Sequence, residues 1–126
     1  MIRTQTWTHD GVEIRPLRVR ERIALVERMS DRAAARAARD AKLVGLAGPA
    51  ALTEVAKARE EAETASALVG RAFSIEGALE ILAVATDDAD SLAERVEPKT
   101  LTALALAAIG IDLEEAERRA TTEGNA

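Results

Sequence analysis

The ionisable and nucleophilic side chains of this chain offer little for catalysis. His9 is the only histidine, and no serine or cysteine stands beside it in the setting that activates a nucleophile. The chain has no cysteine, which excludes disulfides, cysteine-based zinc sites and thiol catalysis. We therefore expect His9 to be a solvent-facing turn residue, and we predict no catalytic residue and no enzymatic activity.

Two acidic clusters could hold a cation or move a proton. Asp87, Asp88 and Asp90 lack the central glycine and the terminal glutamate of a calcium loop. Glu60, Glu61 and Glu63 share a helix face with Lys57 and Arg59, and Lys57–Glu61 and Arg59–Glu63 are four residues apart, so this cluster favours helix-surface ion pairs. We expect helix capping and solubility from both clusters, with no metal and no cofactor.

Two further features bear on nucleic acids. Residues 45–48 have the Gly-x-x-Gly form that clamps a nucleic-acid backbone in one RNA-binding fold, but Leu46 and Ala47 between the glycines favour a plain turn between helices. A row of arginines on one helix face could follow phosphates instead. These are Arg18, Arg22, Arg28, Arg32, Arg36 and Arg39. Acidic neighbours and the shortage of aromatic residues for stacking argue against nucleic acid as the main partner.

A β-hairpin is predicted at the N-terminus. Asp10-Gly11 is a two-residue turn signal, and a type I′ turn there pairs His9 with Val12 and Trp7 with Ile14. These four residues then share one face, which must pack on a helix or on another chain because an isolated hairpin is only marginally stable. The pattern leaves open whether Trp7 belongs to the core or to an interface.

A helical hairpin is predicted over residues 18–69. Its first helix runs over residues 18–44 and carries one apolar stripe: Val19, Ile23, Val26, Ala33, Ala37, Ala41 and Val44. Gly45 and Gly48-Pro49 end it and open a second helix over residues 50–69, whose stripe is also mostly alanine. Two such stripes predict antiparallel helices whose axes lie near the lower end of the usual range of about 8–10 Å.

Two to three shorter helices are predicted over residues 74–120. Ser74 is a candidate N-cap for a helix over residues 75–86, Pro98 opens a helix that Gly110 closes, and Asp112 starts a final short helix. Residues 87–96 are expected to be a loop or a short helix. The fold class is therefore mainly α, with an N-terminal β-hairpin (residues 1–17), the helical hairpin and the short helices in one domain over residues 1–120, followed by a flexible tail over residues 121–126.

Composition predicts a thin core and a chain whose charge is unevenly distributed. Of 126 residues 48% are hydrophobic, but 28 of them are alanine and only Trp7 and Phe73 are aromatic. The net charge of −5 divides into +4 over residues 1–44 and −9 over residues 45–126. This polarity favours docking guided by charge. No apolar run reaches the ~18 residues of a membrane span, so we expect a cytoplasmic protein.

The run DGVEIRPLRVRER at residues 10–22 resembles the start of the small tail assembly chaperones of long-tailed phages. In that family a polar hairpin of this form feeds a long helix, and the remainder of the chain is acidic and helical. The resemblance implies a non-catalytic helper in the host cytoplasm. It would bind the tape measure protein, help to recruit tail-tube subunits and be absent from the mature virion.

Two other hypotheses remain open from the sequence. One is a phage head–tail connector or tail-completion subunit, and the other is a small nucleic-acid-binding regulator that uses the arginine face. A homo-oligomer is also compatible with the open hairpin edge. The residues that we expect at a partner or oligomer interface are Trp7, Ile14, Leu17, Arg18, Arg22, Arg28 and Arg32.

Overall fold

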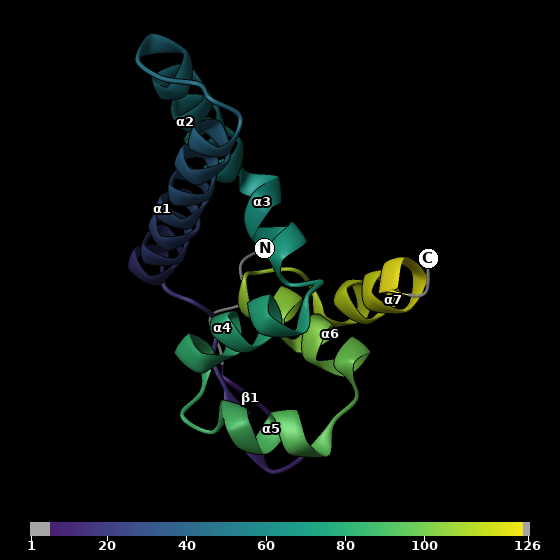
Figure 1. Ribbon diagram of the computed structural model, residues 1–126. Coiled ribbons are helices and arrows are strands. Elements are labelled where there is room, and N and C mark those ends of the chain that lie inside the picture. Colours follow the sequence, from purple (N-terminus) through teal and green to yellow (C-terminus); the bar gives the residue numbers. More distant parts are fainter. Residues whose placement is uncertain (1–5, 125–126) are drawn as a thin grey trace. The chain divides into compact units, whose positions relative to one another are not determined.

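The computed structural model describes residues 6–124, and within them it has a two-stranded hairpin and seven helices (Figure 1). The strands are β1 (Trp7–His9) and β2 (Val12–Ile14). The helices are α1 (Val19–Leu43), α2 (Pro49–Ala62), α3 (Ala65–Arg71), α4 (Ile75–Ala85), α5 (Ala89–Arg95), α6 (Pro98–Ala108) and α7 (Leu113–Gly124). The predicted fold class, mainly α with an N-terminal β-hairpin, is confirmed.

The chain divides into two compact units, whereas the sequence predicts one domain. Unit 1 comprises residues 1–22 and 69–126, and unit 2 comprises residues 23–68. The boundaries fall inside α1 and α3. Unit 2 nearly coincides with the predicted helical hairpin, and unit 1 joins the β-hairpin to the C-terminal helices.

The β-hairpin has the predicted register. Trp7 pairs with Ile14 and His9 with Val12, and the turn residues Asp10 and Gly11 both have positive φ, as a type I′ turn requires. Val12 and Ile14 are buried while Thr8 and Glu13 are exposed, so the predicted face does turn inward. His9 is half-buried on this face, which corrects its assignment to a solvent-facing turn.

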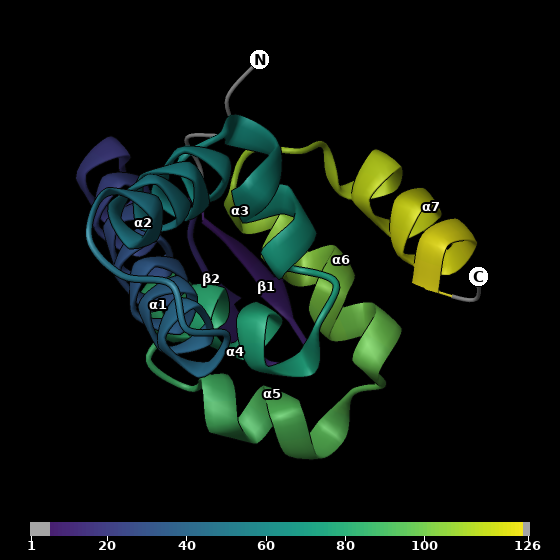
Figure 2. The same cartoon turned by 45° about the horizontal axis from the view of Figure 1, so that its top comes forward.

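Helix α6 is the centre of unit 1. Every residue from Leu101 to Ile109 is buried, and α6 packs against both α4 and α7 (Figures 1 and 2). A helix that is apolar around its whole circumference can be stable only inside other elements. Small side chains such as Ala105 and Ala107 let the neighbouring helices approach closely. The hydrophobic core of unit 1 therefore lies around residues 101–109.

Residues 15–17 connect the hairpin to the helices of unit 1. The backbone N–H of Arg15 donates to the carbonyl of Ala85 (3.0 Å), and that of Leu17 donates to the carbonyl of Ala108 (2.8 Å). Ala85 and Ala108 are the last residues of α4 and α6, whose terminal carbonyls have no partner within their own helices. Pro16, which has no N–H, lies between the two donors. This segment thus caps two helix C-termini at once.

The predicted helix ends are largely found. Ser74 accepts from the N–H of Gly77 (2.9 Å) at the start of α4, and Pro98 occupies the first turn of α6. Gly110 has φ +107°, and the bonds Gly110 N–H to Ala107 and Ile111 N–H to Leu106 form a Schellman motif. The structure has four helices in residues 74–124, α5 among them, where two to three were expected. Helix α7 continues to Gly124, so residues 121–124 of the predicted flexible tail are helical, and residues 125–126 lie outside the described residues.

Unit 2 is an antiparallel pair formed by α1 and α2 (Figure 1), with two departures from the prediction. The second helix ends at Ala62 rather than at residue 69, and residues 65–71 form the separate helix α3. The apolar stripe of α1 is also wrong in its first half, because Val19 and Ile23 are exposed while Leu25, Ser30 and Ala34 are buried. Helix α2 buries no residue fully.

The backbones of α1 and α2 do not approach each other as closely as two facing alanine stripes predict. Instead, polar contacts connect the middle of α1 to the C-terminal end of α2. Ser30 donates to Glu63 (2.9 Å), and Arg59 donates to Asp31 (2.9 Å) and to Ser30 (3.3 Å). Arg59 therefore reaches across to α1 instead of forming the predicted pair with Glu63 on its own helix.

Candidate interaction surface

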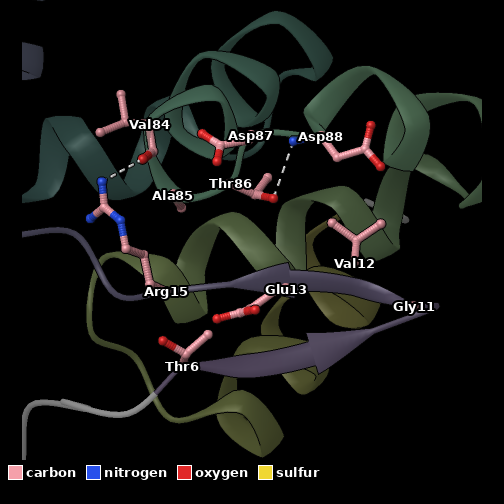
Figure 3. A pocket seen from close by; sticks show the side chains of 10 residues that line it. All are labelled: Thr6, Gly11, Val12, Glu13, Arg15, Val84, Ala85, Thr86, Asp87 and Asp88. Atoms are coloured by element: carbon pink, nitrogen blue, oxygen red, sulfur yellow. Dashed lines mark hydrogen bonds between the residues drawn. The ribbon is translucent and has the colours of Figure 1, made fainter.

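The acidic groups nearest to the hairpin border a pocket of about 350 Å³ in unit 1 (Figure 3). Glu13, Asp87 and Asp88 stand at its edge, and Thr86 accepts from the N–H of Asp88 (3.3 Å) at the start of α5. No group of three histidine, cysteine or carboxylate side chains in the described residues is arranged to hold a metal ion. The hydrogen bond between Asp88 and Thr86 belongs to the turn that precedes α5.

Arg15 and Glu21 form an ion pair beside that pocket. Two nitrogens of the Arg15 guanidinium each lie 2.6 Å from a carboxylate oxygen of Glu21, and Arg15 also donates to the carbonyl of Val84 (2.9 Å; Figure 3). Glu21 further accepts from the N–H of Arg18 (2.8 Å), as the third residue of a helix does in a capping box. The hydrogen bonds from Arg15 and then from the Arg18 backbone lower the pKa of Glu21 to about 2. The pair holds the start of α1 against the hairpin and α4, all within unit 1.

Apart from Ile23, the exposed large apolar side chains of unit 2 lie at or near the connection between α1 and α2. Leu43 is 83% exposed, Val44 74%, Leu46 40% and Leu52 71%. We call these four residues the tip patch. A single exposed leucine is ordinary, but several within ten residues are unusual on a monomer and are typical of interaction sites.

The tip patch continues into a groove between α1 and α2. The groove has a volume of about 310 Å³, and its apolar lining comes from Ala37, Ala41, Ala58, Val44 and Leu46. Its charged lining comes from Asp40, Glu54, Lys57 and Glu61. All four charged residues are exposed, and none of them has an ion pair within the part of the chain that the structure describes. The groove therefore has a small apolar floor and a rim with a net charge of −2.

The tight Gly-x-x-Gly turn supports this arrangement. Gly45 has φ +80° and Gly48 has φ +60°, backbone conformations that residues other than glycine adopt only at a cost in free energy. The N–H of Leu46 donates to the carbonyl of Ala41 (2.8 Å), which completes a Schellman motif at the end of α1. The turn is a connection between helices, as the sequence predicts, and it presents Leu46 toward the groove.

The predicted interface residues at the hairpin have mixed positions within unit 1. Ile14 is fully buried and Leu17 is 4% exposed, so both belong to the core and have no surface to offer a partner. Trp7 is half-buried on the inward face. Arg18 is exposed, and Arg22 is half-buried with its guanidinium near Gly110. The interface prediction is thus wrong for Ile14 and Leu17, because their burial completes the core.

The remaining predicted interface residues, Arg28 and Arg32, belong to unit 2 and are exposed on α1. Arg36 and Arg39 are exposed on the same helix, but Glu27 and Asp31 are exposed among them, and Asp31 pairs with Arg59. This mixture of signs makes α1 a poorer track for phosphates than the arginines alone suggest.

Sequence reasoning missed the tip patch. The sequence pattern places Val44 in the apolar stripe of the first helix and Leu46 in a turn, and it predicts no role for Leu43 or Leu52. A signal was present, because Leu43, Leu46 and Leu52 are large apolar residues that flank a glycine-rich turn, where polar residues are usual.

The comparisons with known proteins give no relatives: no family model matches the chain, and neither a curated protein nor a solved structure gives a significant match. No helix in the described residues is long and apolar enough to cross a membrane.

Proposed function

We propose that this chain is a non-catalytic phage tail assembly chaperone that works in the host cytoplasm by binding other proteins. Its partners would be the tape measure protein and the tail-tube protein, and it would leave before the particle is complete. The proposal combines the resemblance of residues 10–22 to that family with the surface of unit 2.

The observation that carries the proposal is the tip patch. Four large apolar side chains are exposed within residues 43–52, beside a groove in which α2 buries no residue fully. Such a surface suits a helper that holds an amphipathic helix, because apolar side chains at helical spacing can enter a groove between two helices. A long helical partner that aggregates on its own would present many such segments.

Co-expression tests the proposal directly. The proposal expects a long helical protein, the tape measure protein, to be encoded next to this gene; it is produced with and without the full chain, and its soluble fraction is measured. We expect the chain to keep it soluble and to be recovered with it, and Leu52→Ser to reduce recovery. Ile75→Ser, which removes an exposed apolar side chain of unit 1, is the matched control and should leave recovery unchanged. A tape measure protein that stays insoluble with the wild-type chain contradicts the proposal.

The exposed arginines of α1 favour a second candidate, a small nucleic-acid-binding regulator. That function predicts retention of DNA or RNA that weakens steeply as salt rises. A gel shift at low salt that Arg36→Ala and Arg39→Ala abolish would favour it over the chaperone. Mass spectrometry of purified particles separates the third hypothesis, since a connector or tail-completion subunit stays in the virion and a chaperone does not.

A further inference from the structure

We infer that the groove between α1 and α2 binds one short amphipathic helix whose apolar stripe is flanked by lysine or arginine. This inference rests on the proposed function and specifies the segment of the partner that is recognised.

The walls of the groove determine the form of the bound segment. Both walls are helices, whose backbone groups are already hydrogen-bonded within the helix, so there is no strand edge that an extended peptide could extend. Recognition must come from side chains that enter the groove at helical spacing. The lining residues extend over about two turns of each helix, or ~11 Å, so a helix of two to three turns covers them.

The floor of the groove determines the size of the side chains that enter it. Ala37, Ala41 and Ala58 form a shallow floor, and about 310 Å³ is at the lower limit of the ~300–1,000 Å³ of ligand pockets. The groove therefore fits a few aliphatic side chains. Val44 and Leu46 extend the same apolar surface toward the tip patch, where Leu43 and Leu52 are exposed.

The rim determines the charge of the partner. Asp40, Glu54 and Glu61 outnumber Lys57, and none of their charges is neutralised by an ion pair within the described residues. A helix with basic residues on both sides of its apolar stripe would place them beside these carboxylates. An acidic helix would meet like charge, which slows association and weakens binding.

The test measures binding of two designed peptides to the full chain by isothermal titration calorimetry. Both are helices of about three turns with leucines at i, i+4 and i+7; one has lysines on both flanks and the other has glutamates at the same positions. We expect the basic peptide to bind at least about tenfold more tightly, and the difference to narrow as ionic strength rises from about 0.05 M to about 0.5 M. Equal affinity for the two peptides overturns the inference.

Two sets of variants, each with a control outside the groove, locate the site. Glu54→Gln and Glu61→Gln should each lower the affinity for the basic peptide about two- to fivefold. Glu60→Gln, on the same helix but outside the groove, should leave this affinity unchanged. Ala58→Phe should fill the groove and abolish binding, whereas Ala56→Phe, exposed and outside the lining, should not. Circular dichroism confirms that both phenylalanine variants are folded. Unchanged binding by folded Ala58→Phe overturns the inference.

The same variants separate this inference from the proposed function. If the basic peptide binds as predicted but the chain does not hold the tape measure protein, the groove assignment stands and the chaperone function fails. If Ala58→Phe holds the tape measure protein as well as the wild-type chain does, the chaperone function stands and the groove is the wrong site.

Discussion

Individual residues show that the run resembling phage chaperones has a folding role of its own. Arg15 and Leu17 donate their N–H groups to the last carbonyls of α4 and α6, and Glu21 receives the Arg15 guanidinium. The sequence pattern of a hairpin, Arg-Pro-Leu and a helix with glutamate at its third position therefore has a structural reason. These residues connect the hairpin to the helices of unit 1. In the proposed function, the residues that recognise a partner are those of the tip patch.

The Arg15–Glu21 pair makes stability depend on acidity. The pKa of Glu21 falls from 4.5 to about 2 on folding, so its contribution is complete above about pH 4.5 and is lost as the pH falls toward 2. We expect Glu21→Gln to reduce the free energy of unfolding at pH 7 by about 1–2 kcal/mol, since the pair is partly exposed to solvent. Urea denaturation at pH 7 and at pH 3 measures both effects.

The difference between wild type and Glu21→Gln should shrink at the lower pH. Glu27→Gln, an exposed glutamate of the same helix, serves as the control and should have little effect at either pH. A Glu21→Gln variant as stable as wild type at pH 7 would show that the Arg15–Glu21 pair does not stabilise unit 1.

A close contact at Gly77 gives a second prediction for single residues. A Cβ at this position would overlap the backbone carbonyl oxygen of Arg71 and would lie 2.7 Å from the Ser74 hydroxyl that caps α4. Gly77→Ala should therefore destabilise the chain by about 2–4 kcal/mol, because backbone must move and the cap is disturbed. Gly70, also in a helix, has no atom within 4 Å of such a Cβ, so Gly70→Ala should be neutral or stabilise by up to about 1 kcal/mol. Thermal melting of the two variants makes the comparison, and equal melting temperatures would refute it.

Single elements differ in how far the sequence could predict them. The hairpin register followed from a two-residue turn, since that loop length leaves one pairing, and Gly110 and Ser74 ended and began helices for stereochemical reasons. The buried face in the first half of α1 could not be found, because apolar side chains lie on more than one side of it: Val19 and Ile23 on the exposed side and Leu25 on the buried side. The break after Ala62 has no glycine or proline. Its only sequence signal is Thr64, whose hydroxyl donates to the carbonyl of Glu61.

The candidate site was hidden for a related reason. Amphipathic patterns assign an apolar residue to the core, so Val44 was placed in a buried stripe although it is 74% exposed. Only the positions of both helices and of the turn reveal that Val44 and Leu46 border a groove. The central place of α6, in contrast, could have been inferred from a helix with no polar face.

The loss of a leucine should destabilise the chain strongly in α6 and hardly at all in α2. Leu106 is fully buried, so Leu106→Ala should cost about 2–5 kcal/mol of unfolding free energy. Leu52 is 71% exposed on α2, so Leu52→Ala should change stability by less than about 0.5 kcal/mol. Chemical denaturation distinguishes them. A large loss of stability in Leu52→Ala would show that the tip patch is covered in solution.

The whole molecule combines a well-packed unit with a thinly packed one. The buried leucines and isoleucines concentrate in unit 1, on β2, α4, α5 and α6, while α2 in unit 2 buries no residue fully. The few large apolar residues of the chain are thus buried mostly in unit 1 and much less in unit 2. A segment with few buried contacts opens at lower free energy than a packed core, and binding surfaces are commonly found in such segments.

Native-state hydrogen exchange tests this division. Amides of α2 should exchange at least about a hundredfold faster than those of α6, which corresponds to a difference of roughly 3 kcal/mol or more in opening free energy. Similar protection in both helices would contradict the unequal division and would indicate that unit 2 is as firmly packed as unit 1.

The central claim is that the partner binds unit 2 at the groove and the tip patch. Hydrogen–deuterium exchange of the full chain, with and without the tape measure protein, tests it most directly. The account predicts that protection increases in residues 37–61 when the partner is added, while α4 and α6 exchange as before. Protection confined to unit 1, or no change in residues 37–61 under conditions in which the complex forms, would contradict it.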